Sequence, residues 1–237
     1  MRSALLGAIV LLAACTASGG DEGTPRATAQ RTFDVGAFDR VNMAGSYDAV
    51  ISVGGAPSVR AEGDAEALER LEIRVEDGEL RIASRGRGGW SWIGHAHGVT
   101  VHISAPTLIA ASVAGSGDIR IDRVEGPEFA ASVAGSGDLA VAALRVERAA
   151  FSVGGSGNVR AAGSVGEARV SIAGSGNVDL SRVASRAADI QVMGSGDARV
   201  SASETASVML MGSGDVTVTG GARCSIEKRG SGDVNCG

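Results

Sequence analysis

Apolar residues in the second half of the chain alternate with polar and small residues, and a glycine-containing turn interrupts this alternation at regular intervals. The apolar residues stand four and two positions before the first glycine of each turn, and four and six positions after it. In the first unit these residues are Ala111, Val113, Ile119 and Ile121. A period of two is typical of strands that bury one side. Each unit therefore predicts two short strands, one on either side of the turn, that face a common interior.

The turn is Gly-Ser-Gly followed by Asp or Asn, and it occurs seven times. Its first glycines are Gly115, Gly135, Gly155, Gly174, Gly194, Gly212 and Gly230. The intervals are 20, 20, 19, 20, 18 and 18 residues, and so regular a period is typical of stacked structural repeats. One unit cannot cover its own apolar side, and its strand edges need a neighbour. We therefore expect the units to stack in parallel.

These features predict an all-β fold, a parallel β-solenoid with coils of 18–20 residues, and we expect a right-handed β-helix. The repeats begin at about residue 108, after a less regular β region. A propeller would need about 40 residues per blade, and a leucine-rich repeat would show a Leu-Asn signature. The low aromatic content, 3% of the chain, suits a narrow core.

The last residue of each turn should form a column along the solenoid. Its members are Asp118, Asp138, Asn158, Asn177, Asp197, Asp215 and Asp233. In one interpretation these side chains bond nearby backbone amides. In the other, carboxylates about 5 Å apart are bridged by calcium. Calcium-binding repeats have a period of nine residues, and two column members are Asn, so the structural interpretation is favoured.

The region before the repeats also reads as β-structure. Val41–Asp48 resembles a degenerate repeat, and Asp77-Gly78 predicts a hairpin between two apolar runs. Further strands are expected at Val50–Val53 and Val99–Ile103, and a helix only at Ala65–Arg70. With no linker before the repeats, we expect one elongated domain over residues 33–237.

Several segments, taken in order, resemble a known family. They are Ala44–Asp48, Val75–Leu80, Val101–Pro106 and the Val-Ala-Gly-Ser-Gly-Asp repeats. This order is similar to the head GIN domain of autotransporter adhesins, from about Phe33 to the C-terminus. The resemblance implies an exported β-helix, related in shape to polysaccharide lyases without their catalytic residues. It also implies a role in adhesion or in interaction with the cell envelope.

The N-terminus resembles a bacterial lipoprotein signal peptide. Arg2 precedes the apolar run Ala4–Ala14, and Leu12–Cys15 reads as a lipobox. The resemblance implies removal of residues 1–14 and acylation of Cys15, followed by a flexible tether over residues 15–32. Thr16, rather than Asp, after the cysteine favours anchoring in the outer membrane, facing either the periplasm or the surface.

The other two cysteines flank the last turn. Cys224 and Cys236 stand six residues before and after Gly230, in a protein expected to be exported. Disulfides persist in such compartments, so we expect a bridge across the final coil. The spacing fits neither a zinc ligand pair nor a Cys-x-x-Cys redox motif.

One glycine-rich stretch, residues 85–98, departs from the repeat. It contains both tryptophans, Trp90 and Trp92, together with His95 and His97. The tryptophans could fold back over the end of the core, or they could form a contact site for sugars or apolar groups. A metal site on the histidines lacks a third ligand, so we expect no metal and no cofactor.

Charge and repetition narrow the function. Removing the signal takes away Arg2 and leaves 21 basic against 27 acidic residues, a net charge of −6, without a basic run. Nucleic acid is therefore not expected as a partner. We expect a lipid-anchored, non-catalytic solenoid that binds an envelope glycan or protein. The alternatives are a calcium-stabilised structural solenoid and an envelope carbohydrate-active enzyme.

Overall fold

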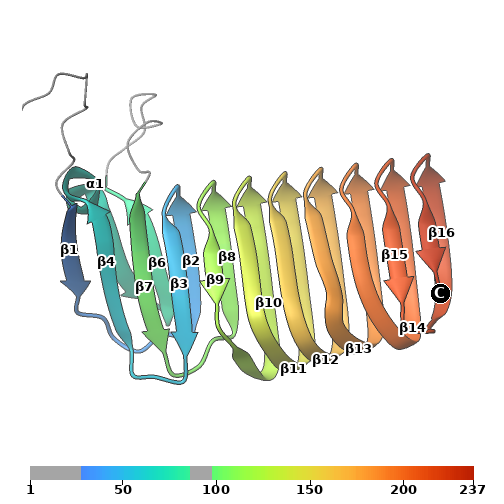
Figure 1. The fold of residues 1–237 in the computed structure, drawn as a ribbon, viewed down its shortest axis with the longest axis horizontal. Coiled ribbons are helices and arrows are strands. Elements are labelled where there is room, and N and C mark those ends of the chain that lie inside the picture. Colours follow the sequence, from blue (N-terminus) through green and yellow to red (C-terminus); the bar gives the residue numbers. More distant parts are fainter. Residues whose placement is uncertain (1–27, 86–97) are drawn as a thin grey trace, which may run out of the picture.

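The computed structural model describes residues 28–85 and 98–237 and shows a rod of stacked coils (Figure 1). The predicted all-β parallel solenoid is confirmed, and β1 lies at the opposite end of the rod from the C-terminus. The described residues contain one helix, α1 (Ala65–Arg70). The strands are β1 (Thr28–Phe33), β2 (Arg40–Gly45), β3 (Asp48–Val53), β4 (Ser58–Asp64), β5 (Leu71–Glu76), β6 (Glu79–Ser84), β7 (Val99–Ala105), β8 (Ala110–Gly115), β9 (Ile119–Ile121), β10 (Val124–Gly135), β11 (Asp138–Gly155), β12 (Asn158–Gly174), β13 (Asn177–Gly194), β14 (Ala198–Gly212), β15 (Val216–Thr219), β16 (Arg223–Gly230) and β17 (Val234–Cys236).

Successive coils are in register. Strands β10 to β14 pair in parallel with their sequence neighbours, and Gly135 pairs with Gly155, which in turn pairs with Gly174. The first coil of the series, β8 and β9, and the last, β16 and β17, join the same ladders. Equivalent residues therefore form columns along the rod, as the repeat interval predicts.

Each regular coil has three faces, one more than the two-strand prediction. In β11 the buried residues fall into three groups, namely Leu139 with Val141, Leu144 with Val146, and Ala149 with Phe151 and Val153. Two consecutive exposed residues separate each group from the next, at positions 142–143 and 147–148. The segment expected to be a plain connection thus buries a pair of residues of its own.

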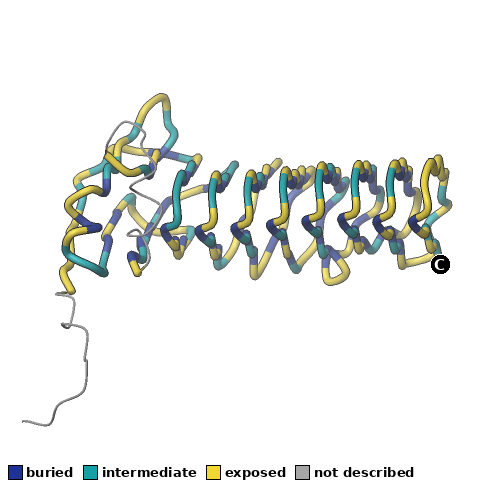
Figure 2. Tube along the Cα trace, turned by 90° about the horizontal axis from the view of Figure 1, so that it is seen from above, coloured by how far each residue is buried: buried dark blue, intermediate teal, exposed yellow. Residues whose placement is uncertain are grey.

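The core runs without interruption inside the coils (Figure 2). The later, 18-residue coils shorten the middle face, because the pairing of β13 with β14 shifts between Leu180 and Ala184. The other two faces keep their inward residues, such as Val200 and Val208, fully buried. Coil length therefore varies at one face, while the strands beside the glycine corner stay aligned.

The degenerate repeat predicted at Val41–Asp48 is confirmed as a coil. Strand β2 pairs in parallel with β8, so that Gly45 faces Gly115, and β3 pairs with β9. On the other side of this coil, β2 pairs in parallel with β6, and β3 pairs in parallel with β7. The regular stack therefore continues for two layers before the first Gly-Ser-Gly turn.

Antiparallel strands close the N-terminal end. Strand β4 runs antiparallel to β7, and β1 runs antiparallel to β4. Strands β5 and β6 form the predicted hairpin, in which Asp77 and Gly78 have φ angles of 51° and 76°. Strand β1 begins at Thr28, so regular structure starts inside the range predicted as tether.

Helix α1, predicted at these same residues, covers the end of the core. Asp64 caps it by accepting a hydrogen bond from the Ala67 amide at 2.9 Å, and Ala67 and Leu68 are buried. Arg31 of β1 lies over the ring of Phe33, 4.6 Å from its centroid, and donates to the Leu68 carbonyl. Strand β1 and the helix thus form one cap.

Candidate binding face

The glycine corner is organised around one carbonyl. The oxygen of Gly115 accepts hydrogen bonds from the amides of Ser136 and Gly137 in the next coil, at 2.9 and 3.0 Å. Gly135 has a φ of 131°, and a Cβ at this position would overlap the Gly115 oxygen. The same arrangement recurs up to Gly230, whose corner bonds the oxygen of Gly212. Glycine is therefore required both by conformation and by close stacking.

At most corners, the side chain of the turn residue accepts a hydrogen bond from a backbone amide of the next coil. Asp118 Oδ1 accepts the Asp138 amide at 3.0 Å, and Asp138 Oδ1 accepts the Asn158 amide at 3.0 Å. Equivalent bonds at 2.9–3.1 Å link Asp48 to Asp118, Asn177 to Asp197, Asp197 to Asp215, and Asp215 to Asp233. A short acceptor is needed here because the corner interrupts the ordinary ladder of backbone bonds.

The two asparagines, Asn158 and Asn177, also form hydrogen bonds between side chains along the column. The Asn158 side-chain amide donates to Asp138 Oδ1 at 2.8 Å, and the Asn177 side-chain amide donates to Asn158 Oδ1 at 2.9 Å. The backbone amide of Asn177 instead bonds the Gly157 carbonyl at 3.2 Å. The amides supply donors that carboxylates lack, so this step reduces like-charge contact in the column.

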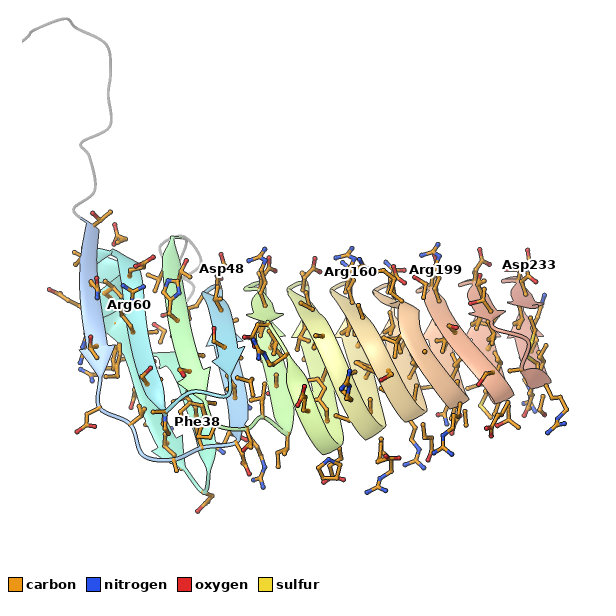
Figure 3. The ribbon with its side chains drawn as sticks, turned by 60° about the horizontal axis from the view of Figure 1, so that its bottom comes forward. Phe38, Asp48, Arg60, Arg160, Arg199 and Asp233 are labelled. Atoms are coloured by element: carbon orange, nitrogen blue, oxygen red, sulfur yellow. A yellow bond between two sulfur atoms is a disulfide. The ribbon has the colours of Figure 1, made fainter. Side chains whose placement is uncertain are left out.

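A column of arginines lies beside the acidic column. Arg120, Arg160 and Arg199 are exposed and stand two residues after the turn residues of their own coils. Their nitrogens lie 3.2 Å from Asp118, 3.5 Å from Asp138 and 4.0 Å from Asp197 respectively. In Figure 3, Asp48, Arg160, Arg199 and Asp233 project along one edge of the rod. We call the turn-residue column and these three arginines the corner face.

The corner face is shallow. A hollow of about 170 Å³ lies on it, lined in part by Asn158, Arg160, Asn177 and Arg199. Pockets that enclose small ligands usually measure about 300 Å³ or more. The corner face is therefore suited to contact with an extended partner rather than to enclosure of a small molecule.

Asp179 lies in the same column as the arginines, paired with Arg160, and is the one acidic residue among the described members of that column. The Ser181 hydroxyl donates to its Oδ1 at 2.6 Å, and the Ser181 amide donates at 3.0 Å. The hydroxyl bond is the main cause that lowers the pKa of Asp179 below its ordinary value of 3.8, with help from Arg199 and Arg182. Asp179 is therefore ionised at neutral pH and alternates in charge with Arg160 and Arg199.

Several predicted site residues lie outside the described residues: Cys15, Trp90, Trp92, His95 and His97. The strands on either side of the tryptophan-containing stretch are described. Strand β6 pairs with β2 and β7 pairs with β3, while β2 and β3 are joined by the corner at Gly45. The end of β6 and the start of β7 therefore both lie beside the corner at Gly45.

The remaining histidine lies on the corner face side of β7. His102 Nε2 is 3.1 Å from Glu62 Oε1, and His102 pairs across the ladder with Val50 and Arg60. The structure thus places His102 in the row that contains Arg120, since both residues pair with Val50.

The predicted disulfide is present. Cys224 of β16 and Cys236 of β17 are bonded, with 6.6 Å between their Cα atoms. Both side chains pack against the end of the core. The bond joins two faces of the last coil.

Residues 28–85 and 98–237 contain no group of three or more His, Cys, Asp or Glu side chains placed to hold a metal ion. They also contain no helix long and apolar enough to cross a bilayer. The turn-residue carboxylates are instead bonded to amides, as described above.

Comparison with known proteins identifies the family. Residues 37–222 match the family model described as putative auto-transporter adhesin, head GIN domain. The chain belongs to the head GIN domain family. No curated protein matches the chain. The resemblance noted from the sequence segments is confirmed.

Solved structures share the head GIN fold. A putative adhesin from Bacteroides fragilis is 19% identical with a TM-score of 0.77, and the match covers 88% of this chain and 96% of that one. A putative lipid binding protein from Parabacteroides distasonis is 20% identical, with a TM-score of 0.72 and coverage of 89% and 96%. A putative adhesin from Parabacteroides merdae is 17% identical, with a TM-score of 0.69 and coverage of 90% and 97%. At these identities the likeness concerns the fold.

Sequence reasoning missed the arginine column. Its signal was present, because Arg120, Arg160 and Arg199 all stand five residues after the first glycine of a turn. The column is interrupted by Ala140 and Asp179, so it does not appear as a strict repeat. Only the stacking of coils brings these residues to the side of the acidic column.

Proposed function

We propose that this protein is an exported, lipid-anchored adhesion module that binds an extended cell-envelope polymer along the corner face. One observation carries the proposal. Hydrogen-bonding and charged groups recur at every coil, about 4.8 Å apart, along a single edge of a shallow surface. A glycan chain offers repeated hydroxyl groups to such a surface, and many weak contacts add up when they are linked.

The proposed role is non-catalytic. Membership of an adhesin family supports it, as do two neighbours described as putative adhesins. Catalysis on a polysaccharide needs acids or a base gathered at one place, whereas the turn-residue column places at most one acid in each coil. A carbohydrate-active enzyme therefore has less support from this geometry.

Anchoring through Cys15 is part of the proposal. Strand β1 begins at the capped end of the rod, 13 residues after Cys15, so an anchor there would hold the cap towards the membrane and the last coil away from it. The lipobox and the polar residues between Cys15 and Thr28 support outer-membrane attachment, on either side. Palmitate labelling of the wild type, and its loss in Cys15→Ala, is expected. Unchanged labelling of the variant would refute the anchor.

The binding face is tested with matched charge changes. Arg120→Gln, Arg160→Gln and Arg199→Gln are combined in one variant, and binding to purified envelope glycans and envelope extract is measured. We expect at least tenfold weaker binding with an unchanged melting temperature, because exposed ion pairs contribute little to stability. The control combines Arg148→Gln, Arg169→Gln and Arg223→Gln, which removes the same number of charges from strand segments that precede a glycine corner instead of following one.

The control also separates the possible surfaces. If the control variant loses binding and the corner variant keeps it, the binding face has been placed on the wrong side of the rod. A third variant, Trp90→Ala with Trp92→Ala, tests the tryptophan-containing stretch in the same assay. Loss of binding in this variant alone would move the contact site to that stretch.

A further inference from the structure

One column of outward-facing residues changes from small residues to methionine along the rod. The residue directly before each first glycine is small in the early coils and becomes methionine in two later ones. In order, the column reads Ala44, Ala114, Ala134, Gly154, Ala173, Met193, Met211 and, in the last coil, Arg229. A third methionine, Met209, stands two residues before Met211 on the same strand. The methionines therefore replace residues that need be no larger than alanine.

The three methionines lie on one side of the sheet. Met193 of β13 and Met211 of β14 are paired in the ladder, so their backbones are about 4.8 Å apart. Met209 and Met211 are separated by Leu210, which is fully buried, so both methionines face outward about 6.6 Å apart. The three positions thus form a triangle whose sides match the reach of flexible thioether side chains.

Their exposure is unusual for such apolar residues. Met193, Met209 and Met211 are 45%, 37% and 36% exposed, whereas Met43 in the core is fully buried. They account for three of the five methionines in the chain. Packing does not explain them, since smaller residues complete the same column in five other coils.

We call Met193, Met209 and Met211 the methionine triad, and the residues that pair with these three carry no net charge. Met193 is preceded in its column by Ala173, and Met209 has Gln191 as its ladder neighbour. On the other side, Glu227 and Arg229 follow Met209 and Met211, and these two side chains bond each other at 2.8 Å. The donor set is therefore made of neutral sulfur atoms, with a small residue on one side that leaves space.

We propose that Met193, Met209 and Met211 form a three-thioether site for a soft monovalent cation, Cu(I). Thioethers favour Cu(I) over hard cations, which prefer oxygen ligands. Three thioether sulfur atoms within reach of one ion can satisfy it without a charged ligand. The ion binds without a change of oxidation state, so no oxidant or reductant is consumed.

Binding is tested on the full chain with Cys15→Ser, so that no free thiol competes, and with the Cys224–Cys236 disulfide verified by mass spectrometry. Cu(I) is presented anaerobically against a chromophoric competitor, and Ag(I) is used as an air-stable second probe in calorimetry. His95→Ala, His97→Ala and His102→Ala are included in every sample to remove imidazole ligands. We expect one ion per chain, at least tenfold weaker binding in each single Met→Leu variant, and loss of binding in the triple variant.

The leucine variants separate a metal site from an apolar patch. Leucine keeps the size and apolar character of the surface and removes only the sulfur, so the fold is retained. Circular dichroism and the melting temperature are measured on the same samples to confirm this. Equal Cu(I) binding by the triple Met→Leu variant and the parent would overturn the proposal.

Discussion

At the residue scale, two adjacent glycines of one corner have different roles. Gly155 has a φ of 120°, and a Cβ on it would overlap the Gly135 oxygen. Gly154 lies just before it, where a Cβ would meet only the Val133 oxygen at 3.9 Å, and the same column holds alanine in other coils. The two glycines are adjacent in the chain and neither is buried, so the pair isolates the effect of the corner.

We therefore expect Gly155→Ala to lower the free energy of unfolding by about 3 kcal/mol, from the positive φ and the displaced corner bonds. Gly154→Ala should change it by less than about 0.5 kcal/mol. Urea denaturation of both variants measures the difference. Similar losses in the two variants would show that the corner tolerates a side chain.

The turn-residue column can be tested at Asp138, whose Oδ1 accepts both the backbone and the side-chain amide of Asn158. Asp138→Ala leaves these donors without their acceptor, and we expect a loss of about 1–2 kcal/mol in unfolding free energy. Asp138→Asn keeps an acceptor oxygen and should lose less than half as much. The measurement is urea denaturation at neutral pH.

The same column decides the calcium alternative. Because its carboxylates bond amides of the next coil, we expect the wild-type melting temperature to be the same with added calcium and with a chelator. A rise in melting temperature with calcium that disappears in Asp138→Asn would instead support a bridging cation.

At the element scale, the last coil depends on its disulfide. Strand β16 places Lys228 at a position that is apolar in earlier coils, and Ile226 is 48% exposed, so this coil buries little. Cys224→Ser removes the bond between two residues 12 positions apart in the sequence. From loop entropy, we expect this to lower the free energy of unfolding by about 3 kcal/mol. We expect hydrogen exchange to accelerate in β16 and β17 while β12 stays protected. Unchanged exchange in β16 would contradict this role.

At the scale of the whole molecule, stability should follow coil number. Deleting residues 136–155 joins Gly135 to Ser156 and removes one coil in register, since β10 presents the same columns as β11. We expect a folded protein with a modestly lower melting temperature and a rod about 4.8 Å shorter by small-angle scattering. Deleting residues 136–145 breaks the register and should abolish the β-sheet signal in circular dichroism. A folded product from this second deletion would argue against columnar stacking.

Much of this architecture could be predicted from the sequence because each coil repeats the same constraints. Gly135, Val133 and Leu139 recur with their spacing, and the Asp77-Gly78 hairpin and helix α1 carry local signals of their own. The middle face was missed, since Leu144 and Val146 align with Gly163 and Val165, so that the pattern is diluted. The arginine column and the methionine triad are set by contacts between coils, and these depend on residues 18–20 positions apart in places where the repeat is not kept.

The cap formed by β1, β4 and α1 has a consequence for how such a molecule can change. Its antiparallel strands close one end, so a coil can be gained or lost only further along the stack, where every layer presents the same edge to the next. If the closed end is the attached one, each duplication of some twenty residues would extend the reach from the membrane by one strand spacing. The distance between the membrane and the last coil would then be set by the number of coils, and it could change without altering the surface residues of any coil.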